Sequence, residues 1–116
     1  MDDAERVDVA ARGRELRFDP SLAEGANVNF VSKLDRGSWR MRTYERGVEA
    51  ETLACGTGTA AAAVLRENWA LNGPEARVMS SSGRILTSTI KRSGPEVRPS
   101  LRGEARVVFV GELAEL

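Results

Sequence analysis

The stretch that decides the fold is Thr52–Thr59, with the sequence TLACGTGT, which runs directly into the helix-forming segment Ala60–Leu65, AAAAVL. It contains Cys55, the only cysteine of the chain. A turn of small residues followed by alanines predicts a helix that begins just after this cysteine. The first N–H groups of a helix have no partner within the helix, and the helix dipole is positive there. We therefore expect the sulfur of Cys55 in a position that favours an anion.

This position suits chemistry at sulfur, because the thiolate is the reactive form of cysteine. The same N–H groups can hold a carboxylate or a phosphate beside it. A lone cysteine is more often a buried, inert thiol, and Gly56–Gly58 could be a plain tight turn. A phosphate-binding loop is disfavoured, because the Gly-Lys-Ser/Thr ending of that motif is missing from the chain.

Composition narrows the function classes. The 116 residues are 41% hydrophobic, which suits one small domain, and 17 Lys+Arg balance 17 Asp+Glu. This balance gives no electrostatic reason to expect nucleic acid or an anionic membrane as a partner. The start of the chain is acidic and lacks the apolar core of a signal peptide, and no apolar run approaches the roughly 20 residues of a membrane span. We expect a cytoplasmic protein.

Residue counts also limit the chemistry. One cysteine cannot form an internal disulfide, and without histidine a metal site is not expected. Acid–base chemistry must then use Cys55, carboxylates, lysine or Tyr44.

Hydrophobic periodicity predicts an α+β fold in a single domain, 1–116. We expect a mostly antiparallel curved sheet wrapped around one central Ala-rich helix, with a short N-terminal helix. The Asp19-Pro20-Ser21 and Asn72-Gly73-Pro74 stretches would end the two helices. Arg40 and Arg42 alternate with apolar residues and indicate a solvated sheet face. The expected helices cover residues 7–17 and 58–71, the loop covers 46–51, and the expected strands cover 26–31, 39–44, 76–80, 84–90, 97–101 and 105–110.

Four segments resemble one known family. They are 24–31 (EGANVNFV), 42–48 (RTYERGV), 51–58 (ETLACGTG) and 103–113 (GEARVVFVGEL). Together they resemble the carboxy-terminal half of diaminopimelate epimerase, and the Tyr-Glu-Arg-Gly and Cys-Gly-Thr-Gly elements are the most specific part of the match. The resemblance implies a cofactor-independent amino-acid epimerase of lysine and cell-wall biosynthesis. It implies two similar domains, each a sheet around a helix, with one cysteine from each domain at the active site between them.

The resemblance also implies roles for single residues. Cys55 would be the second catalytic cysteine, and Gly56 and Thr57 would donate backbone N–H groups to the carboxylate of the reacting centre. Two thiols on opposite faces of the α-carbon remove and deliver its proton without a cofactor. Charge that develops on the carboxylate is stabilised by the N–H donors.

The far end of the substrate would be held by a second set of residues. Glu45 and Arg46 would bind the distal ammonium and carboxylate groups of diaminopimelate, with Asn27 beside them. Asn29 lies on the same strand and is the alternative to Asn27, which has the better motif position. Val48-Glu49-Ala50 makes the following loop one residue longer than is common in the family, which could shift Glu45 and Arg46 relative to Cys55.

The main departure from the family is length. The amino-terminal domain with the other cysteine has no counterpart in the 116 residues, and neither has an Asn-Pro-His segment of the substrate site. We expect the chain alone to be inactive, and we expect an unpaired sheet edge that drives homo-oligomer formation. Two alternatives stay open: a folded binding or structural module without activity, and a related amino-acid racemase on the same fold.

Overall fold

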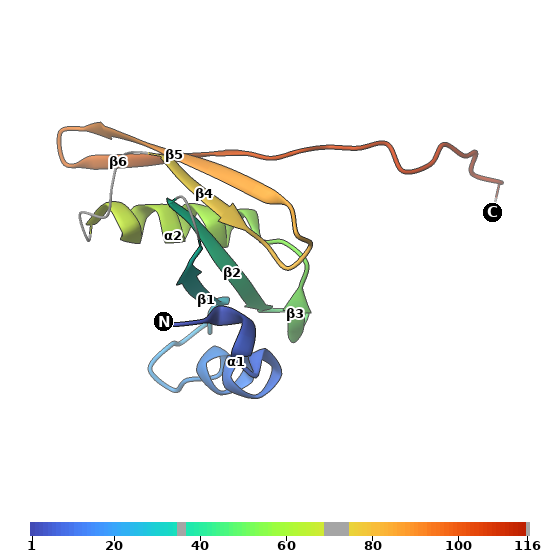
Figure 1. The fold of residues 1–116 in the computed structure, drawn as a ribbon. Coiled ribbons are helices and arrows are strands. Elements are labelled where there is room, and N and C mark those ends of the chain that lie inside the picture. Colours follow the sequence, from blue (N-terminus) through green and yellow to red (C-terminus); the bar gives the residue numbers. More distant parts are fainter. Residues whose placement is uncertain (35–36, 69–74, 116) are drawn as a thin grey trace.

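One mixed sheet with a helix against each face organises the computed structural model (Figure 1), which describes residues 1–34, 37–68 and 75–115. Helix α2 and helix α1 lie on opposite sides of this sheet. The elements in chain order are η1 (Ala4–Arg6), α1 (Val9–Arg17), β1 (Val28–Lys33), β2 (Ser38–Glu45), β3 (Ala50–Thr52), α2 (Gly56–Asn68), β4 (Glu75–Met79), β5 (Ile85–Ser93) and β6 (Glu96–Arg102).

The strands of the six-stranded sheet follow the order β1-β2-β4-β5-β6, with β3 paired to β2 beside β4. Among the described strands only the β2–β4 pair is parallel, and α2 lies between these two strands in the sequence as the crossover that a parallel pair requires. All other pairs are antiparallel. The predicted α+β class with a mostly antiparallel sheet is therefore confirmed.

Alternation along β2 gives the sheet its two packed faces. Met41 packs with Cys55 and Val78 on the α2 side, while Tyr44 packs with Val9 and other residues on the α1 side. Side chains of a strand point alternately to opposite faces, so residues 39, 41, 43 and 45 face α2. This face carries the candidate site.

Helix α1 is held tightly on the second face. The Asp8 side chain caps it by accepting the Ala11 N–H at 3.0 Å. A Cβ atom on Gly13 would lie 2.5 Å from the Cβ of Tyr44, so only glycine allows the helix to cross β2 this closely. The predicted helix at 7–17 is confirmed from residue 9 onward.

Several predicted boundaries were wrong. Strand β1 lies two residues later than predicted, and the predicted loop 46–51 contains the start of β3, whose three residues are too few for a periodic pattern. Helix α2 begins at Gly56 rather than at residue 58. Its predicted end at residues 69–74, and Trp69, lie outside the described residues.

Helix α2 is also less enclosed than predicted. The sheet covers one side of it and buries Gly58, Thr59, Ala63 and Arg66. Leu65, which lines a groove beside β1, remains 48% exposed. The alanine-rich composition indicated close packing correctly, but it did not show that the sheet stops short of surrounding the helix.

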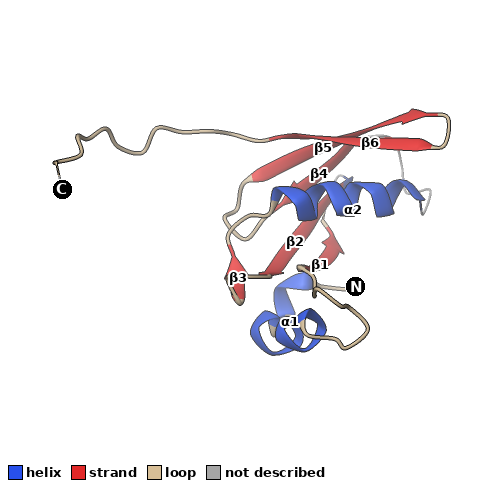
Figure 2. Ribbon diagram, turned by 180° about the vertical axis from the view of Figure 1, so that it is seen from behind, coloured by secondary structure: helices blue, strands red, loops and turns tan. Residues whose placement is uncertain are grey.

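The predicted strand 105–110 was wrong as well. Residues 103–115 form no helix or strand, and Figures 1 and 2 show this tail running away from the sheet. Val107 and Val110 are 84% and 91% exposed. A strand needs a neighbour for its backbone N–H and C=O groups, and none of the described strands pairs with residues 103–115.

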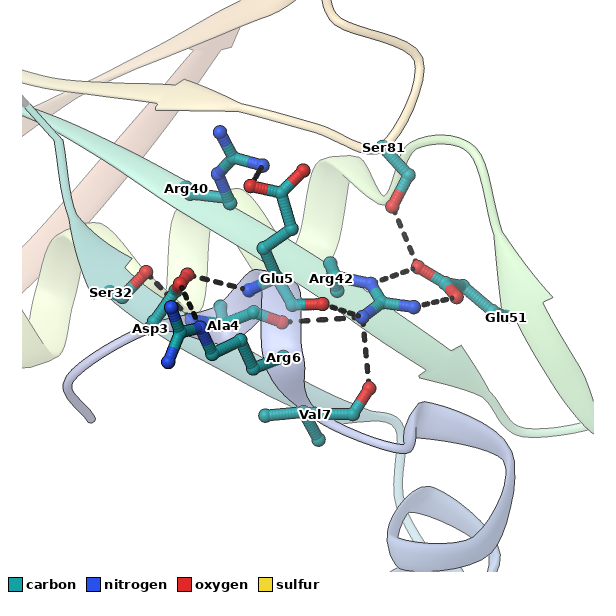
Figure 3. A network of polar contacts seen from close by, with 10 residues as sticks. All are labelled: Asp3, Ala4, Glu5, Arg6, Val7, Ser32, Arg40, Arg42, Glu51 and Ser81. Carbon is teal, nitrogen blue, oxygen red and sulfur yellow. Dashed lines mark hydrogen bonds and ion pairs between the residues drawn. The ribbon is translucent and has the colours of Figure 1, made fainter.

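The face with Arg40 and Arg42 is covered instead of solvated, which corrects another prediction. The N-terminal segment lies across it, and Arg40 pairs with Glu5 at 2.7 Å. The Arg42 guanidinium donates from Nε and Nη2 to the two carboxylate oxygens of Glu51, both at 2.7 Å (Figure 3). Its Nη1 donates to three backbone carbonyls of the segment 4–7, at 2.9 to 3.3 Å.

This ion pair shifts both titrations. The hydrogen bonds from Arg42 hold the pKa of Glu51 below its ordinary value of 4.5, with a further contribution from the Ser81 hydroxyl. The same pairing raises the pKa of Arg42. The Glu51 side chain is only 28% exposed, so the pair is partly shielded from solvent.

None of the helices in the described part of the chain is long and apolar enough to cross a lipid bilayer.

We predict that Glu51 makes stability depend on pH in acid. A carboxylate with a lowered folded-state pKa contributes stability that is fully present above the unfolded pKa and is lost as pH falls through the folded pKa. The free energy of unfolding should therefore decrease below about pH 4.5. Urea denaturation at several pH values should show a smaller decrease for Glu51→Gln, with Glu115→Gln as an exposed control. Equal slopes for Glu51→Gln and the unsubstituted chain would contradict the prediction.

Candidate active site

Cys55 caps the N-terminus of α2, as the sequence predicts. Its carbonyl accepts the backbone N–H and the hydroxyl of Thr59, both at 3.0 Å. Its sulfur accepts the Gly58 N–H at 3.3 Å and lies 3.4 Å from the hydroxyl of Thr57. The sulfur thus takes the place that a serine or aspartate oxygen has at an ordinary N-cap.

The next two N–H groups, of Gly56 and Thr57, belong to the first turn of α2. Groups at these positions have no acceptor within a helix, and the Gly58 N–H is already used by the sulfur. The Gly56 and Thr57 donors are therefore available to an external anion beside Cys55.

Glycines let the sheet approach this helix end from both sides. A Cβ on Gly56 would lie 2.6 Å from Cδ2 of Leu101 in β6. A Cβ on Gly58 would lie 2.4 Å from Oδ1 of Asn29 in β1. Any larger residue would force these contacts apart, so the two glycines have a packing role in addition to any role of their N–H groups.

Cys55 packs against a cluster of apolar side chains. Cys55 is 7% exposed and packs with Met41 and Val78, with Val31 and Ala62 at the border of this cluster. Low polarity on one side strengthens the electrostatic effect of the helix N-terminus on the other. The arrangement differs from an inert core thiol because the Gly58 N–H of the helix donates to the sulfur.

Asn27, Glu45 and Arg46 lie together at the end of the β1–β2 pair. Asn27 precedes β1 and Arg46 follows β2, and antiparallel pairing brings the two ends side by side. The Asn27 Oδ1 accepts the Arg46 N–H at 2.8 Å. The Arg46 guanidinium is exposed and donates to the carbonyl of Glu24 at 2.9 Å. Glu45 is the last residue of β2.

Asn29 lies between β2 and the start of α2, which gives it more weight than the sequence suggested. Its Oδ1 accepts the Thr43 hydroxyl at 2.8 Å, and its amide lies against Gly58 of α2. Because alternate residues of a strand share a face, Asn29 stands one step from Asn27 toward the start of α2. The Asn-Val-Asn spacing already contained this information, since it places both amides on one face.

The longer loop after Arg46 is absorbed in a closed turn. Gly47 and Glu49 have positive φ angles of 90° and 58°. The Glu49 carboxylate accepts the Gly47 N–H at 2.9 Å and the Arg17 Nε–H at 3.0 Å. These hydrogen bonds, of which the one from Gly47 has the largest effect, hold the pKa of Glu49 below its usual range. The turn is thereby tied to α1.

In the described ranges, no group of three or more His, Cys, Asp or Glu side chains is placed to bind a metal ion. The arrangement places a sulfur beside two N–H groups that can bind an anion.

Comparison with known proteins assigns the family. A family model described as diaminopimelate epimerase matches residues 1–108. The diaminopimelate epimerase of Gemmatimonas aurantiaca is 52% identical over 99% of this chain and 45% of its own length. Those of Hydrogenobaculum sp. and Aquifex aeolicus are 42% and 40% identical, over 97% and 99% of this chain and 40% and 41% of their own lengths. The chain thus spans less than half the length of these curated relatives. It belongs to the diaminopimelate epimerase family.

Proposed function

We propose that this chain forms the carboxy-terminal half of a cytoplasmic diaminopimelate epimerase, which interconverts the LL and meso forms for lysine and peptidoglycan precursor synthesis. The observation that carries the proposal is the capping of α2 by Cys55. It places a sulfur next to two free N–H donors, those of Gly56 and Thr57.

The reaction follows from this geometry. The thiolate of Cys55 removes the α-proton from one face of the substrate, so the C–H bond breaks and its electron pair passes toward the carboxylate. A thiol on the opposite face, supplied by the other half of the enzyme, delivers a proton to the α-carbon. The N–H groups of Gly56 and Thr57 stabilise the charge that develops on the carboxylate oxygens. In the reverse direction the two sulfurs exchange roles.

Substrate recognition in this proposal uses the group at the end of β1 and β2. Arg46 binds the distal carboxylate and Glu45 binds the distal ammonium group, and the Asn27 amide holds the turn that carries them. Asn27 and Glu45 lie on the α2 face of the sheet together with Asn29, whose amide lies against Gly58 near Cys55. Binding at the far end therefore orients the α-carbon toward the sulfur.

We predict that the 116-residue chain alone does not epimerise diaminopimelate, because one thiol serves only one face. Fusing the amino-terminal half of the Gemmatimonas aurantiaca relative ahead of Met1 should produce activity. The measurement is conversion of the LL to the meso form in D2O, with deuterium incorporation at the α-carbon followed by NMR. Cys55→Ala should lower the rate of the fused protein by about 10²-fold or more.

Other outcomes of this experiment separate the alternatives. Turnover by the 116-residue chain alone, or full activity of Cys55→Ala, would contradict the proposal. Conversion only of amino acids without a distal amino-acid end would favour a related racemase. Binding of diaminopimelate without exchange in the fused protein would favour a non-enzymatic module. Leu113→Ser, which changes a fully exposed tail residue, is the control for expression and handling.

We also propose that the isolated chain forms a homodimer in which the tail of one copy pairs with β1 of the other. β1 is at an edge of the sheet. The carbonyl of Val31 points away from β2 and accepts the N-terminal amine of Met1 at 3.2 Å. Since backbone directions alternate, Asn29 and Lys33 also direct N–H and C=O groups to this open edge.

The tail fits this edge in length and character. Residues 105–110 number six, as do those of β1, and 107–110 is a continuous apolar run. Such runs are typical of strands buried on both faces. Next to β1 lies an apolar groove of about 330 Å³ against α2, lined mainly by Phe30, Val31, Trp39 and Leu65.

A tail cannot reach its own β1. Four strand intervals of about 4.8 Å separate β6 from β1 in the sheet. The three peptide steps from Arg102 to Ala105 span at most about 10 Å. The occupant must therefore come from a second copy.

We predict a dimer by light scattering at high concentration, with slow hydrogen exchange of the amides in 105–110. Phe109→Asp should give a monomer with fast exchange, because a charge cannot be buried against β1 without a large free-energy cost. Leu113→Asp, beyond the pairing segment, should remain dimeric. A monomer at every concentration would refute this dimer.

A further inference from the structure

The backbone that leads into Cys55 is anchored at alternate residues. Glu51 in β3 is held through its carboxylate, which also accepts the Ser81 hydroxyl at 2.8 Å. Two residues later, the Leu53 carbonyl accepts the Ser82 N–H at 3.0 Å. Two residues later again, Cys55 is held by its capping bonds to α2. The path to the sulfur thus has three fixed points within five residues.

The partners on the far side of this path are themselves rigid. Ser81 and Ser82 belong to the turn that joins β4 to β5. This turn is closed by hydrogen bonds from the Gly83 N–H to the Ser80 carbonyl at 2.9 Å and from the Ser80 N–H to the Arg84 carbonyl at 3.0 Å. It therefore acts as a fixed support for the strand and loop beside it.

Arg42 links this backbone path to the strand that carries the proposed recognition residues Glu45 and Arg46. It projects from β2, the strand that ends in Glu45 and continues to Arg46. Its guanidinium donates two parallel hydrogen bonds to the Glu51 carboxylate of β3. Every guanidinium nitrogen has a partner, since Nη1 binds the carbonyls of the segment 4–7. A lysine has a single nitrogen and could not make the fork and the carbonyl bonds together.

We infer that Arg42 and Glu51 are positioning residues that hold Cys55 at a fixed separation from Glu45 and Arg46. The inference rests on the proposed function of these three residues. Arg42 and Glu51 lie on the face of the sheet away from α2 (Figure 3), where both line a cavity of about 410 Å³. The proposed substrate position at the start of α2 is on the other face, so neither side chain would touch the substrate. Their effect on the reaction passes through β3 and the loop to Cys55.

The separation matters because the two parts of the site stand on different elements. Cys55 and the N–H donors belong to α2, whereas distal recognition belongs to β1 and β2. A bound substrate bridges both parts, so a shift of β3 against β2 moves the sulfur relative to the α-carbon. Misplacement by about 1 Å can cost on the order of 10²-fold in rate.

The first experiment measures alkylation of Cys55 by iodoacetamide in the 116-residue chain. The thiolate attacks the CH2 carbon, a C–S bond forms, and iodide leaves as the C–I bond breaks. Arg42→Lys and Glu51→Gln should raise the rate severalfold, because a released loop exposes Cys55, which is now buried with 7% of the residue exposed. Circular dichroism must show that the variants are folded.

A matched control and a milder variant keep this experiment decisive. Arg92→Lys weakens the pair with Glu67, which lies at the far end of α2, and should leave the alkylation rate unchanged. Ser81→Ala removes only one bond to Glu51 and replaces Arg42→Lys if that variant fails to fold. Rates equal to or below that of the unsubstituted chain for Glu51→Gln and Ser81→Ala would overturn the inference.

The second experiment uses the fused protein with both halves. Arg42→Lys should lower kcat by about tenfold or more, while KM stays within about threefold because the distal recognition group is unchanged. Loss of stability alone would reduce the amount of active enzyme without this split between kcat and KM after correction for active sites. An unchanged kcat would overturn the inference. If the unsubstituted fused protein has no activity, the proposed function fails, and the alkylation rates still decide whether Arg42 and Glu51 position Cys55.

Discussion

The capping of α2 by Cys55 is the interaction on which the rest of the structure depends. A helix that starts in the middle of a sheet domain leaves N–H groups unpaired unless a side chain or a ligand accepts them. Here the Cys55 sulfur accepts the Gly58 N–H, and the Cys55 carbonyl accepts the Thr59 N–H as the first bond of the helix. The N–H groups of Gly56 and Thr57 remain available to an anion. Helix α2 is the crossover between the parallel strands β2 and β4, so the position of its start also determines how the chain returns to the sheet as β4.

Small residues around the helix start serve packing and chemistry together. Gly56 and Gly58 allow β6 and β1 to approach from the two sides, to distances at which no Cβ fits. The same closeness brings Asn29 against α2, and the Asn29 side chain also accepts the Thr43 hydroxyl of β2. A site of this kind needs a rigid support, because its parts come from separate elements. The Arg42–Glu51 pair and the Ser80–Gly83 turn supply such support from the opposite face.

The sequence predicted features that depend on neighbouring residues and missed those that depend on contacts with distant parts of the chain. The helix after Cys55 and the strand with Trp39 and Met41 depend on short-range patterns and were predictable, although α2 begins two residues earlier than expected. The proximity of Asn27 to Arg46 was implied only by the resemblance to the family. The tail 105–110 has a strong strand pattern, but a strand requires a partner that the pattern cannot specify. The face with Arg40 and Arg42 looked solvated because nothing in β2 shows that residues 4–7 lie across it. Strand β3 has only three residues, too few for any periodicity.

The central claim is that the N–H groups proposed to bind the substrate carboxylate, those of Gly56 and Thr57, are in place in this chain, although the proposed reaction needs a second thiol. Amide NMR of the 116-residue chain during titration with diaminopimelate tests it most directly. The account predicts saturable shifts of the Gly56 and Thr57 amide signals, retained in Cys55→Ser, with no conversion between the LL and meso forms. Saturable shifts confined to residues away from the start of α2, or no shifts at all, would contradict it.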